Sequence, residues 1–477
     1  MDKRVTSPLV LAAIASAIII AVGGAVVFMR PSPLPDVSAV EMPAPASPPG
    51  GAYTTELSNR NAFAAPGPLS DAERRIFFFG NRLFNTNWTT APGSVKSFDG
   101  LGPVFNRVSC SGCHTRDGRG RPPLNGETDF DSMLIRVSVP GVAADGGPNP
   151  HAAYGDQIND KAILGVPAEA KVSVSWTTVE GTYADGSKYE LQKPAFTLSE
   201  PAFGPFGADL MTSPRVANQV YGLGLLEVVY ADDILTRADP DDKDGDGISG
   251  RPNWVTDPET GKKALGRFGW KANQASLVAQ DTGAARGDIG LSTTLRPGQN
   301  CETVQTACAA APDGDEPEIS DEFLEKLVLY SRTLAVPARR NPTDPDIMAG
   351  GKLFASSGCA ACHTPTMVTG HAADPIGLAN QTIHPFTDML LHDMGPDLAD
   401  GRPDYEATGS EWRTPPLWGI GLIPAVNDHD RLLHDGRARG VAEAILWHGG
   451  EGEASRERFR ALSAKERDSL VAYVNSL

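Results

Sequence analysis

The sequence predicts a mainly α-helical protein of two tandem domains with one plan, the first enlarged by β-hairpin and loop insertions, behind an N-terminal transmembrane helix. Three observations lead to this fold class. A five-residue cysteine motif occurs twice, at residues 110–114 and 359–363. Other segments recur in the same order in both halves of the chain. One long uncharged stretch stands near the N-terminus, at residues 9–29.

The uncharged stretch at residues 9–29 is apolar or small throughout and is long enough to cross a bilayer as a helix. Lys3 and Arg4 precede it, which places the N-terminus in the cytoplasm. Because no small-residue cleavage site follows directly, we expect an uncleaved anchor over residues 1–30 rather than a cleaved signal peptide. Residues 31–66, rich in Pro, Ala and Ser, should then be a disordered or polyproline tether. The expected location is a bacterial cell membrane, with the remaining domains in the periplasm.

The repeated motif is Cys-x-x-Cys-His, and its two copies use four of the six cysteines of the chain. It is the attachment site of a c-type haem, because two thiols at this spacing can add to the two vinyl groups of a porphyrin while the His stands under the iron. A zinc site would need a further Cys/His pair near each motif, and a dithiol redox site does not need the His. Two covalently bound c-type haems are therefore expected, on Cys110, Cys113 and His114 and on Cys359, Cys362 and His363.

Three more segments repeat in register with the haem motifs. Their first copies are residues 80–84, 220–225 and 327–334, and their second copies are residues 350–354, 417–422 and 470–477. Capping boxes at 70–73 and 463–466 predict where the first and last helices begin. We therefore expect two cytochrome-c-like domains, over residues 67–336 and 337–477. In each, the first and last helices cross and the haem fills the core.

The first domain carries the insertions. Apolar and polar residues alternate on both sides of an Asp185-Gly186 turn, which predicts a β-hairpin around residues 172–191. Farther along, Cys301 and Cys308 lie in a polar loop and should form a local disulfide in an oxidising compartment.

A second insertion holds Asp242, Asp244 and Asp246, with Gly247 at the sixth place of the run. Alternating carboxylates before such a Gly fit a calcium loop. Asn253 stands where an EF-hand loop has its bidentate Glu, so a plain acidic turn explains the pattern equally well.

Four segments with specific motifs carry a family resemblance. The chain resembles the bacterial di-haem oxidoreductases often labelled "thiol oxidoreductase", whose domain plan is similar to that of di-haem cytochrome c peroxidases and of the enzyme that matures methylamine dehydrogenase. Thioether-bound sulfurs cannot exchange, so we take the thiol label as a misreading of the haem cysteines. In the relatives one haem passes electrons and the other meets peroxide. The resemblance covers about residue 68 to the end and lies in residues 105–123, 266–272, 391–396 and 412–418.

The resemblance also implies a sixth ligand for the C-terminal haem. The relatives place a Met or Tyr where His448 falls, so a bis-His iron is expected here, with a His bound to haem propionate as the alternative reading. His392 and Met394, in one loop, are the other candidates. The N-terminal haem has no evident sixth ligand, since His151 lies in a loop that reads as surface.

The relatives further imply a distal pocket at the N-terminal haem. They have a Trp between the haems, a Gln ten residues on and a carboxylate about ten after that; here these are Trp270, Gln280 and Asp288, with a shorter gap and Asp in place of Glu. The Trp would relay electrons, the Gln would position peroxide and the acid would shuttle protons. Trp270 as core and Asp288 as a surface turn is the alternative reading, and Glu227 is a second candidate acid.

A calcium ion lies between the haems of the relatives, on an Asn, a Thr and a Pro carbonyl. Asn218, Thr414 and Pro416 occupy similar places in this chain. Lys271 and Arg413 are expected to pair with haem propionates rather than to catalyse.

Together these features predict a membrane-anchored di-haem c-type oxidoreductase that passes electrons through its C-terminal haem to a peroxidase-like N-terminal haem. The alternative is a non-catalytic electron-transfer cytochrome that serves a periplasmic partner, with a role in iron handling. The net charge of −17 argues against nucleic acid and suits a basic redox partner, such as a small cytochrome or a cupredoxin, or simply a soluble surface.

Overall fold

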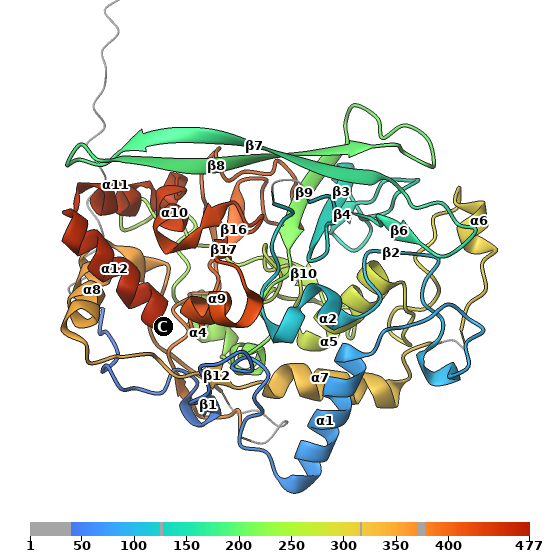
Figure 1. Cartoon of the computed structure of the whole chain (residues 1–477), viewed down its shortest axis with the longest axis horizontal. Helices are drawn as coiled ribbons and strands as arrows, with labels where there is room; N and C mark the ends of the chain where they lie inside the picture. Colours follow the sequence, from blue (N-terminus) through green and yellow to red (C-terminus); the bar gives the residue numbers. More distant parts are fainter. Residues whose placement is uncertain (1–39, 125–126, 315–316, 371–376) are drawn as a thin grey trace, which may run out of the picture.

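Two pairs of crossing helices frame the molecule in the computed structural model (Figure 1). In the N-terminal half, α1 (Asp71–Asn85) packs against α7 (Asp321–Thr333). In the C-terminal half, α8 (Pro345–Ser356) packs against α12 (Ala464–Ser476). The structure describes residues 40–124, 127–314, 317–370 and 377–477.

A glycine at each crossing explains why the two helix pairs can pack so closely. A Cβ on Gly80 would lie 2.2 Å from the carbonyl oxygen of Lys326, and a Cβ on Gly350 would lie 1.9 Å from that of Ser469. Only Gly leaves this space for a facing backbone. The expected capping boxes are also present and begin α1 and α12.

Shorter helices connect the two pairs and surround the cysteine motifs. The N-terminal half contains α2 (Cys110–Cys113), α3 (Leu223–Glu227), α4 (Ala231–Leu235), α5 (Leu277–Ala284) and α6 (Thr306–Ala309). A π-helical turn, η5 (Ala285–Ile289), continues α5. The C-terminal half contains α9 (Ile423–Asn427), α10 (Gly440–Leu446) and α11 (Glu453–Ala461).

One four-stranded antiparallel sheet stands in the N-terminal half. Its central strand is β3 (Met133–Val142), which pairs with β4 (Pro148–Asn149), β5 (Gln157–Ile158) and β9 (Met211–Val216). Ile135 faces Ile158 in β5 and Pro214 in β9, so the sheet joins segments far apart in the chain.

All other sheets in the described residues have two strands. The short ones are β1 (Thr54–Thr55) with β12 (Val336–Pro337), β2 (Val104–Phe105) with β6 (Lys161–Ala162), β10 (Trp254–Thr256) with β11 (Lys263–Leu265), β13 (Met367–Val368) with β14 (Thr382–Ile383), β15 (Leu391–Asp393) with β16 (Glu411–Arg413), and β17 (Arg431–Leu432) with β18 (Ala438–Arg439).

The predicted hairpin is confirmed and is longer than expected. Strands β7 (Lys171–Thr182) and β8 (Lys188–Ser199) pair along their whole length. The hairpin runs from the N-terminal half over the helices of the C-terminal half (Figure 1, green, along the top). At the tip of the hairpin, the Asp185 carboxylate forms a 2.8 Å ion pair with Arg467 of α12. The predicted disulfide between Cys301 and Cys308 is also present.

The expected fold class is wrong in its balance. Helix accounts for 29% and strand for 20% of the residues, so the chain is not mainly α-helical. The difference comes from the segment between the first cysteine motif and α3, where β3 pairs with β9 and Met133 faces Val216, 83 residues farther along the chain. Such pairing is non-local, so no short sequence window reveals it.

The membrane anchor and the membrane localisation are corrected as well. The expected anchor at residues 9–29 lies outside the described residues. Among the residues that the structure does describe, no helix is both long and apolar enough to span a bilayer. An assignment to the cell membrane, with domains facing the periplasm, therefore has no support and is withdrawn.

The tether expected over residues 31–66 is corrected in its second part. From residue 40 onward the chain packs on the molecule, and Tyr53 and Phe63 are both fully buried in the main apolar cluster. Strand β1 also pairs with β12, at the junction of the two expected domains. Two aromatic anchors in a Pro-rich stretch are enough to order it, because each buries a large apolar surface. The domain boundaries at 336 and 337 themselves stay a prediction.

Candidate haem sites

Each cysteine motif opens into a large cavity. The N-terminal cavity, of about 1430 Å³ with the solvent at its mouth, is lined by Cys110, Cys113 and His114. The C-terminal cavity, of about 1460 Å³, is lined by Cys359, Cys362 and His363.

The four motif cysteines are free thiols, in contrast to the Cys301–Cys308 pair. Burial raises the pKa of the thiols of Cys113 and Cys359 to about 12. Neutral buried thiols do not suit thiolate exchange or a dithiol redox site. Their place at the wall of a cavity fits covalent attachment to a bound group, and this observation supports the haem assignment.

The motif histidines are oriented as ligands of a metal in the cavity. His114 Nδ1 lies 2.6 Å from the Asn218 carbonyl oxygen, and His363 Nδ1 lies 2.9 Å from that of Phe386. A carbonyl can only accept, so each ring carries its proton on Nδ1 and keeps a lone pair on Nε2. Burial also lowers the pKa of His363 to about 4, which keeps the ring neutral. Such a carbonyl partner typically orients a metal-binding His.

His448 shows the same arrangement on the C-terminal cavity. It follows α10, lines the cavity, and its Nδ1 lies 2.6 Å from the carbonyl oxygen of Ala444. Burial lowers its pKa, and its charge contributes to the lowered pKa of His363. The geometry thus gives the C-terminal cavity two neutral imidazoles, each with Nε2 available.

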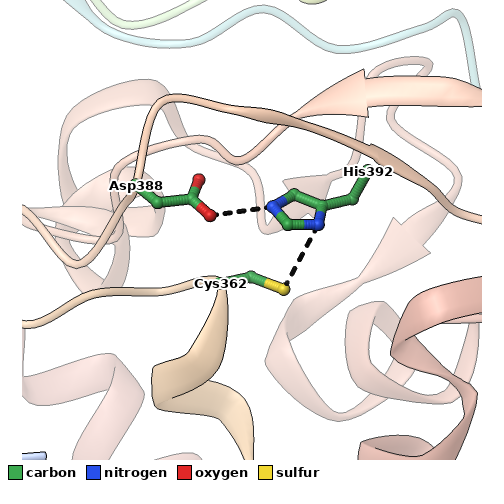
Figure 2. Close-up of side chains that lie close together, drawn as sticks. All are labelled: Cys362, Asp388 and His392. Carbon is green, nitrogen blue, oxygen red and sulfur yellow. Dashed lines mark hydrogen bonds and ion pairs between the residues drawn. The ribbon is translucent and has the colours of Figure 1, made fainter. Parts of the chain in front are cut away.

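His392 has no free ring nitrogen, although it lines the same cavity. Its Nε2 lies 2.8 Å from Asp388 and its Nδ1 lies 2.6 Å from Glu451. Figure 2 shows the ring between Asp388 and the sulfur of Cys362, which lies 3.7 Å from Nδ1. Burial opposes a positive charge on this ring, but the charges of Cys362 and Asp388 hold the pKa of His392 well above its usual value. A thioether at Cys362 would carry no charge, so the carboxylates must then hold the imidazolium.

Two further side chains of the C-terminal cavity could compete with His448. Met394 lines the cavity, and its terminal methyl group lies close to Gly452. His434 also lines the cavity, stacks on Trp412 at 3.7 Å between ring centroids, and has its pKa lowered to about 4 by burial.

The N-terminal cavity has a different set of ligating groups. His114 is its single His among the described lining residues, and His151 lies elsewhere, with its Nε2 3.2 Å from the Phe206 carbonyl oxygen. One thioether, Met133 of β3, lines the cavity and is buried beside Trp270. Nothing in the local sequence pattern singled out Met133, because it reads as one more apolar residue of a strand.

Two carboxylic acids line the N-terminal cavity. Asp288, on η5, accepts a 2.8 Å hydrogen bond from Gln157. Asp281, on α5, accepts a 3.0 Å hydrogen bond from Ser331. Burial raises the pKa of Asp288, and it raises that of Asp281 to about 7. Asp281 escaped the sequence reasoning, although its place next to Gln280 could have marked it.

The other two residues of the expected distal group fall in different places. Gln280 lines the N-terminal cavity, and its side chain forms no hydrogen bond within the described residues. Glu227 lies outside the cavity, where its carboxylate accepts from the Leu277 backbone N–H and pairs with Arg332 at 2.6 Å. The role of Glu227 in the structure is to cap α5, so it is a poor candidate for an acid at the cavity.

A shared wall separates the two cavities. Among the described residues, four line both of them, and these are Gln219, Trp270, Arg413 and Pro416. Trp270 is buried with its indole N–H on the Val216 carbonyl oxygen, at 2.8 Å. The structure thus places an aromatic ring in the wall that the two cavities share.

Arginines supply the positive charge around the cavities. Arg136 and Arg215 line the N-terminal cavity. Arg136 also pairs with the exposed Asp156, and Arg215 pairs with the buried Asp404. Arg413 lines both cavities, as a partner for haem carboxylates would. Lys271 does not line either one, since its Nζ is fully buried against Asp400 at 2.9 Å. An Arg inside an apolar strand, as at Arg136, is a sequence signal that could have been read.

Only some of the oxygen ligands expected for the two calcium sites lie where they could bind an ion. Asn218 lines the N-terminal cavity, Thr414 the C-terminal one and Pro416 both. The Thr414 carbonyl already accepts from Thr387, whereas the expected ligand of Asn218 is its side chain, not the backbone carbonyl that meets His114. In the acidic loop the converging carboxylates are those of Asp239, Asp242 and Asp244, within 4.8 Å of one another. Asp246 instead accepts from the backbone N–H of Ile248, at 2.7 Å.

Comparison with known proteins gives one match. The model of the family described as "Di-haem oxidoreductase, putative peroxidase" matches residues 46–477. No curated protein matches the chain, and no solved structure does.

Proposed function

The chain belongs to the di-haem oxidoreductase family, and from this premise we propose that it is a c-type cytochrome peroxidase of two unlike haems. Cys110, Cys113 and His114 would hold the reacting haem. The electron-transferring haem would be held by Cys359, Cys362 and His363, with His448 as sixth ligand. Electrons would come from a small cytochrome or a cupredoxin, and hydrogen peroxide would be the substrate.

The observation that carries this proposal is the unequal supply of ligands in two cavities that share a wall. The C-terminal cavity offers two neutral imidazoles with a free Nε2, which suits a six-coordinate, low-spin haem. The N-terminal cavity offers one imidazole together with two carboxylic acids of raised pKa. A position left for substrate beside an acid with raised pKa is what peroxide reduction needs.

When bound, a haem with an open position would supply the electrons and the coordination site for this reaction. Reduction of one peroxide to two waters consumes two electrons and two protons, so the protein must also deliver protons. We assign the proton shuttle to Asp288, whose carboxyl oxygen would take the proton of one peroxide oxygen and return it to the other. The hydrogen bond from Gln157 to Asp288 holds this carboxyl in place. Gln280, with its free amide, would orient the peroxide.

The alternative function is a non-catalytic electron-transfer cytochrome. Met133 favours it, because a thioether that lines the N-terminal cavity could fill the sixth position of that haem. Two six-coordinate haems would then leave no place for peroxide.

The spectrum of the ferric protein tests the choice. We expect one high-spin and one low-spin haem by electron paramagnetic resonance, and a spectral change on adding peroxide to the half-reduced protein. Two low-spin signals without a peroxide response would reject the peroxidase. If Met133→Leu then converted one signal to high-spin, the electron-transfer function would stand.

Calcium is proposed as a structural ion at two places, the loop of Asp239, Asp242 and Asp244 and the cavity wall at Asn218, Thr414 and Pro416. Oxygen donors of this kind suit calcium. Calcium added after chelation should raise the melting temperature of the protein, and Asp242→Asn should reduce the effect if the loop is the site. No change on chelation or calcium addition would exclude both.

A further inference from the structure

Trp270 has an uncommon electrostatic environment. The guanidinium carbon of Arg119 lies 4.8 Å from the centroid of the Trp270 ring. Both side chains are buried, with 6% and 5% of their surface exposed. A cation over an indole face is attracted to the neutral ring, more strongly where water is excluded. The same charge repels a positive charge on that ring, so the indole becomes harder to oxidise.

The charge of Arg119 is not cancelled by a carboxylate in the described part of the chain. Its Nε donates to the Arg431 carbonyl oxygen at 3.0 Å, and its Nη2 donates to that of Leu433. Burial lowers the pKa of Arg119 to about 10, which still leaves it cationic at neutral pH. The charge of Asp435 also acts on Arg119, but the two form no ion pair, and Asp435 pairs with Arg437 at 2.7 Å. The charge of Arg119 therefore still acts on Trp270.

A second indole next to the same cavity offers a contrast. Lys271 Nζ lies 4.5 Å from the ring centroid of Trp412, but it also lies 2.9 Å from Asp400. The Asp400 carboxylate neutralises the Lys271 ammonium, so the group beside the Trp412 ring is an ion pair rather than an unpaired cation. Trp412 is as buried as Trp270, and its indole N–H also meets a carbonyl, that of Leu398 at 3.0 Å.

The hydrogen bond of Trp270 adds a second barrier to oxidation. An indole that has lost an electron becomes stable only when its N–H proton moves to a base. The partner of this N–H is the Val216 carbonyl oxygen, which is no base at neutral pH. A hole on Trp270 would thus be repelled by Arg119 and could not be trapped by loss of the proton.

We propose that Arg119 keeps Trp270 in its reduced state, so that the shared wall conducts electrons between the two cavities without the indole being oxidised. One electron would pass from the C-terminal haem to the N-terminal haem, with no net change in the oxidation state of Trp270. Arg119 touches neither haem in this proposal. It acts through Trp270, because its positive charge makes that indole harder to oxidise. This inference deepens the proposed function, because it rests on two haems on either side of the wall.

The test uses the haem-loaded full chain and no peroxide, so its outcome does not depend on peroxidase activity. A light flash on a ruthenium polypyridyl sensitiser, with persulfate as electron acceptor, generates a one-electron oxidant. Oxidised Trp270 and Trp412 are quantified by peptide mass spectrometry, and the radicals are observed by paramagnetic resonance after freezing. In the wild type we expect clearly less oxidation at Trp270 than at Trp412.

Variants separate charge from structure. Arg119→Gln should raise the oxidation of Trp270 about tenfold, the order expected for losing a desolvated cation at a ring face, and should leave Trp412 unchanged. Arg119→Lys keeps the charge and should keep the protection. Lys271→Gln is the matched control, and it should not change oxidation at Trp270. Haem content and the low-spin spectrum report whether each variant is folded.

Two results would overturn the inference. One is equal oxidation of Trp270 and Trp412 in the wild type, which needs no variant and so holds even if Arg119→Gln fails to fold. The other is a folded Arg119→Gln protein with unchanged oxidation at Trp270, as expected if a haem carboxylate already neutralises Arg119. A protein that passes this test but ignores peroxide would lose the proposed peroxidase function and keep the protected wall.

Discussion

The two halves of the molecule share a frame and differ in what fills it. Both cross a first and a last helix at a glycine, and both point a motif His into a cavity with a backbone carbonyl behind it. The C-terminal cavity adds a second neutral His, and its nearby acids Asp388 and Glu451 are held ionised by His392. The N-terminal cavity instead adds Asp281 and Asp288, whose pKa values burial raises.

This difference shows where one fold acquires two chemistries. In the proposed function, the repeated segments would supply attachment and proximal ligation in both halves. The residues that distinguish the cavities come from outside the repeats, on α5 and η5 in one half and after α10 in the other. The same scaffold can therefore stabilise a closed iron in one half and leave an acid beside an open one in the other.

Removal of one attachment site should give the largest effect. Cys359→Ala with Cys362→Ala should lower the haem content from two to one per chain, because only the C-terminal motif is lost. The count is read from the pyridine haemochrome spectrum of the denatured protein. Cys110→Ala with Cys113→Ala is the matched change in the other half. Two haems in either variant, or haem extractable by acid acetone from the wild type, would contradict covalent attachment.

Removal of the second imidazole should make the two halves more alike. His448→Ala should convert the low-spin ferric signal to high-spin with two haems retained, because His448 lines the same cavity as His363 and keeps Nε2 available. Paramagnetic resonance and the haem count measure this. Met394→Ala is the control and should leave the low-spin signal in place. The opposite pattern would make Met394 the ligand.

Neutral replacements of the two cavity acids should separate their roles. Asp288→Asn should slow peroxide reduction by about 10²–10⁴, the usual loss for a positioned acid–base group. Asp281→Asn should slow it by no more than a few-fold. Stopped-flow mixing of the half-reduced protein with peroxide gives both rates, with the haem spectra as a check on folding. If Asp281→Asn is the slower variant, the shuttle is Asp281.

A smaller effect is expected in the pH dependence of stability. Burial raises the pKa of Asp117, in the N-terminal half, to about 7 from 3.8, and its carboxyl accepts a 2.6 Å bond from Tyr330. Between these values the folded state binds a proton that the unfolded state does not, so stability is lost as pH rises. The free energy of unfolding in urea should fall between pH 5 and 7, by about 2 kcal/mol at most from this group.

The control for that prediction is Asp117→Asn, which keeps the acceptor for Tyr330 and should remove this part of the pH dependence. The ionisation of Asp435, in the C-terminal half, should change stability with pH in the opposite direction. Although burial opposes its charge, His434 and Arg437 hold its pKa below the usual value. Its contribution should therefore be lost as pH falls. An Asp117→Asn protein with the same pH slope as the wild type would show that Asp117 is ionised when folded.

Local chemistry let the sequence alone determine several features of this protein. Cys-x-x-Cys-His predicts a haem site, because the residues that would bind the haem lie within five consecutive positions. The helix crossings, the hairpin and the disulfide depend on a repeated Gly, an alternating pattern with a turn, and two near Cys. The family was also identified from short segments, and the match over residues 46–477 confirms it.

Only the tertiary structure decided what depends on distant partners. The β3 sheet pairs strands that are far apart in the chain, so the helical share was overestimated. Tyr53 and Phe63 anchor the second part of the expected Pro-rich tether in the main apolar cluster. His392 and His448 look alike in sequence, yet Glu451 and Asp388 occupy both nitrogens of one, while the Ala444 carbonyl leaves Nε2 of the other free. The reason is the same in each case, because burial and the partner atom set the chemistry of a side chain, and neither is written next to it in the chain.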